Sequence, residues 1–241
     1  GWIQYFKREK TNHVVFLDHD FYDEKRVYTG SLRDEYLKYQ TIFEQIEAKR
    51  PDVKTYELFP SFRINGYSSF AKQVDYAIEI TKKDETNFSY IYWTEPDMTQ
   101  HDHGIDSKAT KDMLVSLNKE VERLSQHVAK DTTMIVIADH GLTNVKGIDL
   151  FDNLELLSCL KRKPSIETRA ATFFVKPFRK KRFRGLFNQA YGKEFELYTK
   201  QELYDSGLLG YGTKHPLLDE FICDYLAIST SDKMFNFKEH S

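Results

Sequence analysis

Aspartate and histidine side chains cluster at two places in the chain, each directly after an apolar run. The first cluster contains Asp97 and His101, and the second is the adjacent pair Asp139 and His140. Carboxylate oxygen and imidazole nitrogen are the usual protein ligands for Zn²⁺ and for other divalent first-row ions. Two such clusters, each just after a predicted core strand, therefore predict a metal site.

Each cluster alone also has a simpler interpretation. Asp97 can cap a turn or a helix, and His140 can be a solvated loop residue. A loop that folds back brings Asp97 and His101 to one ion. Asp139 and His140 would point to opposite faces of a regular strand, so they converge only if the chain turns, which Gly141 permits.

The elements that must position these residues are two strands and a helix. We predict strands over 88–93 and 132–138, with a helix over 107–129 between them. Strand, helix and strand in this order form a βαβ unit, so the two strands are expected to be parallel. Ligands of open α/β sheets bind outside the carboxyl ends of the strands. Residues 132–138 are nearly all apolar, which predicts a strand buried on both faces.

The rest of the chain shows the same alternation of short apolar runs and helical patterns. An apolar stripe predicts one helix over 31–49, with Pro51 just beyond it. Neither repeats nor a Pro/Gly/Ser linker occur, so we expect one domain over 1–241, incomplete at both ends because neither end has a natural boundary pattern. The other predicted elements are a helix over 70–83 and strands over 13–17, 56–59, 169–175, 195–198 and 221–229.

Composition excludes several classes of protein. The chain has 241 residues, and its 18 Phe, 15 Tyr and 2 Trp are too many apolar rings for a disordered chain. No apolar stretch is long enough to span a membrane. The net charge of −2 lacks the basic excess typical of nucleic-acid binders, and we interpret the local basic run 179–184 as a solvated helix face.

Two cysteines, Cys159 and Cys223, lie far apart in apolar surroundings. Buried free thiols are the simplest interpretation. This pattern excludes a disulfide framework and favours a reducing, cytoplasmic compartment.

The two Asp–His motifs resemble those of the type I phosphodiesterase/nucleotide pyrophosphatase family, within the alkaline phosphatase superfamily. That family has Pro-Asp followed by His and Gly, as at Asp97, His101 and Gly104, and a later Asp-His-Gly followed by a large apolar residue, as at 139–142. The chain departs from the first motif at Gln100, where Gly is common.

The resemblance implies a fold and a set of cofactors. The implied fold is α/β, with a mostly parallel, alkaline-phosphatase-like sheet flanked by helices on both faces. The implied cofactors are two divalent metal ions, zinc or alternatively manganese. In the family one ion is held by one Asp and two His, and the other by two Asp and one His. Matching the motifs assigns Asp97 and His101 to the first ion, and Asp139 and His140 to the second.

The third ligand of the first ion is a histidine near the C-terminus of the family domain. Two residues are candidates here, His215 and His240. The position of His240, after the predicted strand 221–229 and a short Phe-Lys segment, favours it over His215. Pro216 follows His215 directly, which is typical of a structural turn.

The activity implied by the resemblance is metal-dependent hydrolysis of a phosphodiester or nucleotide pyrophosphate through a covalent phospho-Thr/Ser intermediate. No Thr or Ser here stands in the family's nucleophile context, so we expect the nucleophile outside this chain and the chain to be inactive alone. The alternatives are another activity of the superfamily (phosphomonoesterase, phosphonate hydrolase, sulfatase or phosphomutase) and a non-catalytic metal-binding relative. The expected partner is a small phosphate ester or nucleotide, and the sequence does not define the oligomeric state.

Some neighbouring residues have two interpretations. Asp102 and His103 can support the ligands, or they can be exposed loop residues. Aromatic side chains can stack on a base or an aryl leaving group, although such rings are more often part of the core. The aromatic residues concerned are Phe62, Tyr92, Trp93 and Tyr211.

Overall fold

The computed structural model describes residues 3–36, 38–214, 216, 218–222 and 224–238. The chain forms two compact units: unit 1 consists of Gly1–Lys38 with Val145–Ser241, and unit 2 consists of Tyr39–Asn144. These units are defined by how the chain packs and not by what it does. The prediction of one catalytic domain over 1–241 is therefore untested by this division and stays a prediction.

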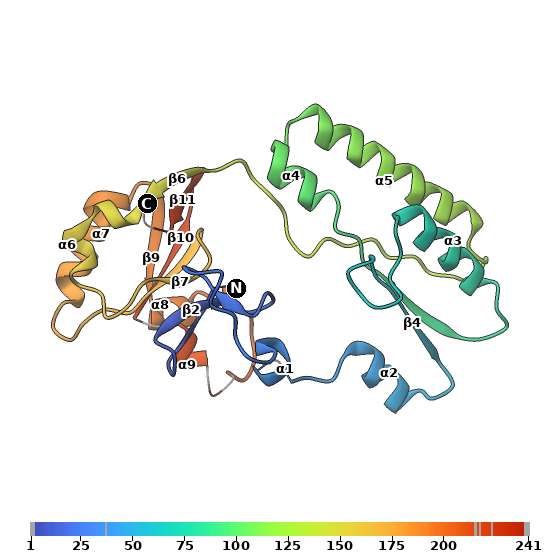
Figure 1. Ribbon diagram of the computed structural model, residues 1–241, viewed down its shortest axis with the longest axis horizontal. Helices are drawn as coiled ribbons and strands as arrows, with labels where there is room; N and C mark the ends of the chain where they lie inside the picture. Colours follow the sequence, from blue (N-terminus) through green and yellow to red (C-terminus); the bar gives the residue numbers. More distant parts are fainter. Residues whose placement is uncertain (1–2, 37, 215, 217, 223, 239–241) are drawn as a thin grey trace. The chain divides into compact units, whose positions relative to one another are not determined.

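Unit 1 contains a seven-stranded sheet, in the order β3-β2-β1-β7-β8-β10-β9. Figure 1 labels β2, β7, β9 and β10 of this sheet. All of its pairings are antiparallel. The prediction of a mostly parallel sheet is therefore wrong for this unit, because short turns such as the one between β1 and β2 return the chain antiparallel. The strands are β1 (Ile3–Phe6), β2 (Thr11–Val14), β3 (His19–Asp20), β7 (Ser165–Ile166), β8 (Ala170–Phe173), β9 (Phe195–Thr199) and β10 (Tyr225–Ser229).

Smaller elements complete unit 1. Strands β6 (Lys146–Asp149) and β11 (Lys233–Asn236) pair in parallel. The helices are α1 (Leu32–Tyr36), the 3₁₀ turn η1 (Leu150–Asp152), α6 (Leu154–Leu157), α7 (Lys180–Tyr191), α8 (Lys200–Asp205) and α9 (Leu218–Phe221).

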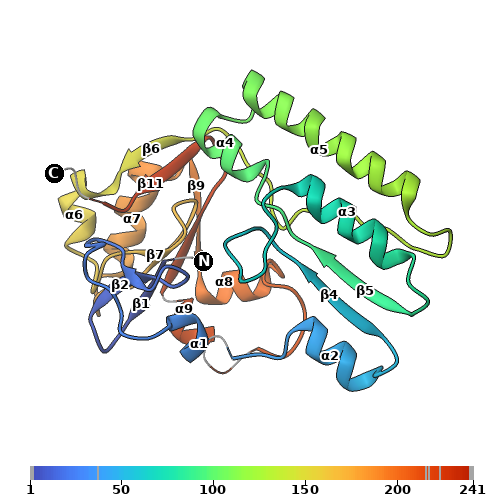
Figure 2. The ribbon, with the colours of Figure 1, turned by 45° about the vertical axis from the view of Figure 1, so that its right-hand side comes forward.

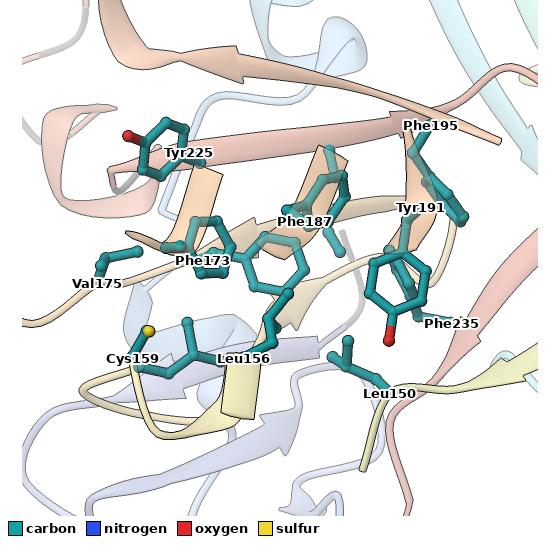
Figure 3. Packing of buried hydrophobic residues seen from close by; sticks show 14 of the residues in the cluster. Leu150, Leu156, Cys159, Phe173, Val175, Phe187, Tyr191, Phe195, Tyr225 and Phe235 are labelled. Atoms are coloured by element: carbon teal, nitrogen blue, oxygen red, sulfur yellow. The ribbon is translucent and has the colours of Figure 1, made fainter. Parts of the chain in front are cut away.

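The core of unit 1 is built from aromatic rings contributed by strands and by α7 (Figure 3). Phe173, Phe183, Phe187 and Phe235 are fully buried. The rings of Phe195 and Phe235 stack with their centroids 4.1 Å apart. Such rings each bury a large apolar area, so this cluster is the main source of stability in unit 1.

Unit 2 is built on two parallel strands, β4 (Lys54–Leu58) and β5 (Asn87–Ile91), joined by α3 (Phe70–Thr81). Side chains alternate between the two faces of β5. Phe88 and Tyr90 contact Phe43 of α2 (Ile42–Lys49) on one face, and α3 packs on the other. This strand pair is therefore parallel and has helices on both faces, although the parallel partner predicted for 88–93 was the segment 132–138.

Two helices of unit 2 agree closely with their predicted ranges. Ser69 caps α3 and Ser107 caps α5 (Lys108–His127), each by accepting a hydrogen bond from a backbone N–H in the first turn. The two helices lie side by side (Figure 2). Arg123 of α5 joins them through an ion pair with Asp75 of α3, at 2.7 Å.

The predicted strand over 132–138 is wrong. Among the described residues, no strand pairs with this segment, which runs extended with no assigned regular structure. Ile135, Val136 and Ile137 are 79%, 69% and 76% exposed. An apolar run becomes a buried strand only when a neighbour supplies ladder hydrogen bonds and cover. The βαβ unit is β4–α3–β5 instead.

Two other predicted elements have different boundaries. The single helix predicted over 31–49 is two helices, α1 and α2, because Thr41 and Glu44 form a capping box that starts α2. The predicted strand over 221–229 is shorter at its start, since α9 ends at Phe221 and β10 begins at Tyr225. Strands 56–59, 88–93, 169–175 and 195–198 correspond to β4, β5, β8 and β9. The predicted strand 13–17 overlaps β2 only at its first two residues, because the chain turns at 15–18.

No helix within the described ranges is both long enough and apolar enough to cross a bilayer.

Candidate metal centre

The first Asp–His cluster lies on a helix rather than on the predicted loop. Residues Asp97–His103 form α4, which follows the carboxyl end of β5. Residues four apart lie on the same face of a helix, so Nε2 of His101 comes within 3.5 Å of Oδ1 of Asp97. Gly104 ends α4 with φ of 81°, a conformation that favours glycine, and a Cβ there would lie 3.1 Å from Oδ1 of Asn144.

The second cluster lies on an extended segment that is fixed at its far end by Asn144. Oδ1 of Asn144 accepts a hydrogen bond from the backbone N–H of Ile105, at 3.1 Å. Its Nδ2 donates to Oδ2 of Asp106, at 3.0 Å. The chain bends at Asp139, as the convergence of Asp139 and His140 requires. Asn144 therefore holds the second cluster beside the C-terminal end of α4.

The two clusters meet at the carboxylate of Asp97. Nε2 of His140 lies 4.0 Å from Oδ1 of Asp97 and 3.7 Å from Oδ2 of Asp139. Together with His101, these contacts join four side chains through pairwise distances of 3.5 to 4.0 Å. All four belong to unit 2, so their proximity is a property of that unit.

The oxygen at the centre of this cluster, Oδ1 of Asp97, is buried but accepts no hydrogen bond. A buried acceptor without a donor carries a desolvation cost of about 1–3 kcal/mol unless a cation or water satisfies it. Ligands of one tetrahedral zinc ion, with metal–ligand bonds of about 2.0–2.2 Å, lie ~3.3–3.6 Å from one another. The separation of His101 from Asp97 falls in this range.

The ligand set is incomplete within the described residues. Over the ranges that the structure describes, no three His, Cys, Asp or Glu side chains surround one ion position. The donor types and the orphaned oxygen of Asp97 fit a divalent cation, but a complete site needs further ligands.

The imidazole of His140 is oriented by its neighbour. Nδ1 lies 3.1 Å from the carbonyl oxygen of Gly141. A carbonyl oxygen only accepts, so Nδ1 carries a proton in this contact, and Nε2 is the ring nitrogen that faces the carboxylates. The side chains of His101, Asp139 and His140 are 65%, 76% and 55% exposed, so the cluster is open to a ligand.

Two further residues support the site. The buried Gln73 of α3 donates from Nε2 to the carbonyl oxygens of Leu58 and Tyr92, at 3.0 and 3.1 Å, and so fixes the carboxyl ends of β4 and β5 together. Burial raises the pKa of Tyr92, and the negative charges of Asp139 and Asp97 raise it further. Tyr92 therefore keeps its proton in the electrostatic field of both carboxylates. The apolar pattern identified Tyr92 only as an aromatic side chain, and no sequence signal indicated the role of Gln73.

The other predicted site residues are not part of this cluster. His215 and His240 lie outside the described residues. Asp102 and His103 are exposed on α4, in agreement with the simpler interpretation. Among the aromatic candidates, Trp93 packs against Phe70 with ring centroids 6.0 Å apart, whereas Phe62 and Tyr211 are 64% and 99% exposed.

A model of one family, "Type I phosphodiesterase / nucleotide pyrophosphatase", matches residues 4–206. This match covers most of the sequence, and the chain therefore belongs to that family.

Relatives and solved structures agree with this assignment. The chain is 31% identical over 100 residues to human ectonucleotide pyrophosphatase/phosphodiesterase family member 5, and 29% identical over 86 residues to mouse family member 7. These alignments span 38% and 33% of the chain, and 21% and 20% of the relatives. Murine member 5 superposes with a TM-score of 0.63 at 16% identity, over 99% of this chain and 64% of that one. The structural likeness concerns the fold.

Proposed function

We propose that the chain carries part of the catalytic site of a metal-dependent hydrolase that cleaves phosphodiester or nucleotide pyrophosphate bonds. The observation that carries the proposal is the position of two imidazoles beside one oxygen. Nε2 of His101 and Nε2 of His140 both face Oδ1 of Asp97, which is buried and accepts no hydrogen bond.

In this proposal Asp97, His101, Asp139 and His140 hold divalent metal ions, zinc or alternatively manganese. The bound ions supply charge that stabilises the phosphoryl oxygens and the leaving oxygen. The chain's own residues orient and position the ligands. Gly141 orients the imidazole of His140, Asn144 holds the second cluster in place, and Tyr92 keeps its proton in the electrostatic field of the carboxylates.

The proposed substrate class is a nucleotide or another small phosphate ester. A structure of an inactive form of murine member 5 is described as a complex with AMP and superposes with a TM-score of 0.61 at 16% identity. We extend this ligand chemistry to the present chain through family membership. A covalent phospho-Thr/Ser intermediate is part of the proposal, with the nucleophile supplied from outside these 241 residues.

The test is hydrolysis of an aryl phosphodiester such as bis-p-nitrophenyl phosphate, with Zn²⁺ or Mn²⁺ added. We expect turnover by a longer protein in which this sequence is joined to a segment that supplies the nucleophile, and little or none by the 241-residue chain alone. Asp139→Ala should abolish turnover in the longer protein, whereas the exposed α4 variant Asp102→Ala should retain it. Hydrolysis that is unaffected by a chelator and by Asp139→Ala would refute the proposal.

The third histidine ligand is tested separately, because both candidates lie outside the described residues. His240→Ala should lose one metal ion per protein together with activity, whereas His215→Ala should keep most of the metal. The opposite pattern in metal analysis would assign the ligand to His215. Full metal content in both variants would contradict a C-terminal histidine ligand at the first ion.

A further inference from the structure

The loop that leads into α7 exposes an aromatic ring with an unusual backbone. Phe178 is 103% exposed, and its φ is 63°. Positive φ is a genuine outlier for a bulky residue, since its Cβ crowds the neighbouring carbonyl. Residues 176–182 are all exposed. Phe178 therefore projects from the surface of unit 1 instead of joining the aromatic core a few residues away.

Cations flank Phe178 in the sequence, at the N-terminal end of a helix, where positive charge is unfavourable. Lys180, Lys181 and Arg182 occupy the first turn of α7, which contains no acidic residue. The N-terminal end of a helix carries partial positive charge, so cations in the first turn raise the electrostatic energy of the helix. The loop and the helix end together form a concentrated positive region, which attracts anions.

Part of this basic run is neutralised within the fold. Lys180 pairs with Asp224 at 2.6 Å, Arg182 with Glu155 at 2.5 Å, and Arg184 with Glu202 at 3.1 Å. Lys176 donates to the carbonyl oxygen of Ser158, at 2.9 Å. These contacts account for the predicted solvated helix face.

Two cations within three residues of Phe178 are left without such contacts. Among the described residues, the side chains of Arg179 and Lys181 have no hydrogen-bond or ion-pair partner. A second exposed apolar side chain, Leu154, is 74% exposed. It belongs to α6, which packs beside α7 (Figure 1). An aromatic tip, two unpaired cations and an aliphatic side chain thus lie on the α6–α7 pair and the loop that leads into it.

We infer that Phe178, Arg179 and Lys181 form a contact site for an anionic membrane surface. Phe178 enters the interface between headgroups and acyl chains, and the two cations contact lipid phosphates and carboxylates. Each cation near such a surface strengthens binding about fivefold, so one ring and two cations give weak, reversible adsorption. Single-stranded nucleic acid is also bound by aromatic rings and cations, but its binding sites are grooves in which successive bases stack on several rings. Among the described residues, Phe178 has no ring partner that would form such a groove, which favours lipid.

The test is co-sedimentation of the chain with vesicles of phosphatidylcholine, with and without phosphatidylserine. We expect binding to the phosphatidylserine vesicles, weakened by salt, and no binding to pure phosphatidylcholine. Phe178→Ala should reduce the partition coefficient about tenfold, and Arg179→Ala and Lys181→Ala about fivefold each. Two matched controls should leave binding unchanged: Tyr211→Ala removes an equally exposed ring elsewhere, and Arg184→Ala removes a paired cation.

A second measurement reports insertion directly. Brominated lipid should quench the fluorescence of the tryptophan introduced by Phe178→Trp, but not that of the tryptophan introduced by Tyr211→Trp. The inference is overturned if the chain fails to bind phosphatidylserine vesicles, or if Phe178→Ala binds as well as the unaltered chain. Tighter binding to an oligothymidine than to the vesicles, with the same variants affected, would assign the site to nucleic acid instead.

Discussion

The two units of the molecule differ in where their apolar residues lie. Unit 1 buries a continuous set of rings, with Phe173, Phe183, Phe187 and Phe235 fully enclosed. Unit 2 has a smaller core around Leu58 and leaves the apolar segment 133–137 exposed. The candidate metal centre lies in unit 2, at the end of this exposed segment. Dense packing and candidate chemistry are therefore found in different parts of the chain.

The largest expected effect is on the stability of unit 1. The ring of Phe187 contacts those of Phe173, Phe183, Tyr191, Phe195 and Phe235. Truncation by Phe187→Ala should lower the free energy of unfolding by about 3–5 kcal/mol, measured by urea denaturation. Phe178→Ala, which removes a fully exposed ring, is the matched control and should change it by less than ~0.5 kcal/mol. Equal effects of the two variants would contradict the packing described for unit 1.

A smaller effect is expected in unit 2, where a polar contact holds the strand ends. Gln73→Leu removes the amide that joins the carbonyl oxygens of Leu58 and Tyr92. It should destabilise unit 2 by about 1–3 kcal/mol. It should also weaken metal binding, because only residues 92–96 separate β5 from α4. Gln126→Leu, on the exposed side of α5, should change neither quantity. If the Gln73→Leu variant were as stable as the unaltered chain and bound metal with the same affinity, the proposed support of the metal centre by Gln73 would be wrong.

The smallest expected effect depends on pH and lies in unit 1. Burial by itself raises the pKa of Asp224, but hydrogen bonds from Lys180 and from the backbone N–H of Val175 outweigh it, so the pKa is lowered. A lowered folded-state pKa gives stability that is complete above the unfolded pKa of about 3.9 and is lost as pH falls through the folded value.

Asp224→Asn should therefore cost about 1 kcal/mol of unfolding free energy at neutral pH, and the difference from the unaltered chain should shrink in acid. Urea unfolding midpoints of the two proteins at neutral pH, and at a pH below about 4, the ordinary pKa of an aspartate, measure this difference and its change with pH. A difference in stability that grows in acid would contradict a lowered pKa of Asp224.

Prediction from sequence succeeded where the signal was local. Helices α3 and α5 were predicted from apolar spacing alone, and in the structure Ser69 and Ser107 cap their first turns. Prediction failed where the structure of a segment depends on residues far away in the sequence. The apolar run 132–138 has the pattern of a strand whether or not a neighbouring strand pairs with it. Likewise, no local pattern indicates that the strands of unit 1 pair antiparallel. The break before Thr41 had a local signal, Thr-x-x-Glu, which the longer apolar stripe obscured.

The candidate centre shows the same division. Residue types and spacing identified Asp97, His101, Asp139 and His140, and the structure brings all four together. The supporting contacts of Gln73 and Asn144 join residues far apart in sequence, and such contacts leave no local pattern.

Zinc binding by the chain tests the central claim most directly. Competition with a chromophoric chelator should show that the unaltered chain binds Zn²⁺. Asp97→Asn should lose affinity by more than the ~10–100-fold typical of a residue that only orients a ligand. Asp102→Asn, a carboxylate exposed on the same helix, should bind as the unaltered chain does. Equal affinities for Asp97→Asn and Asp102→Asn, or no Zn²⁺ binding by the unaltered chain, would contradict a metal centre at Asp97.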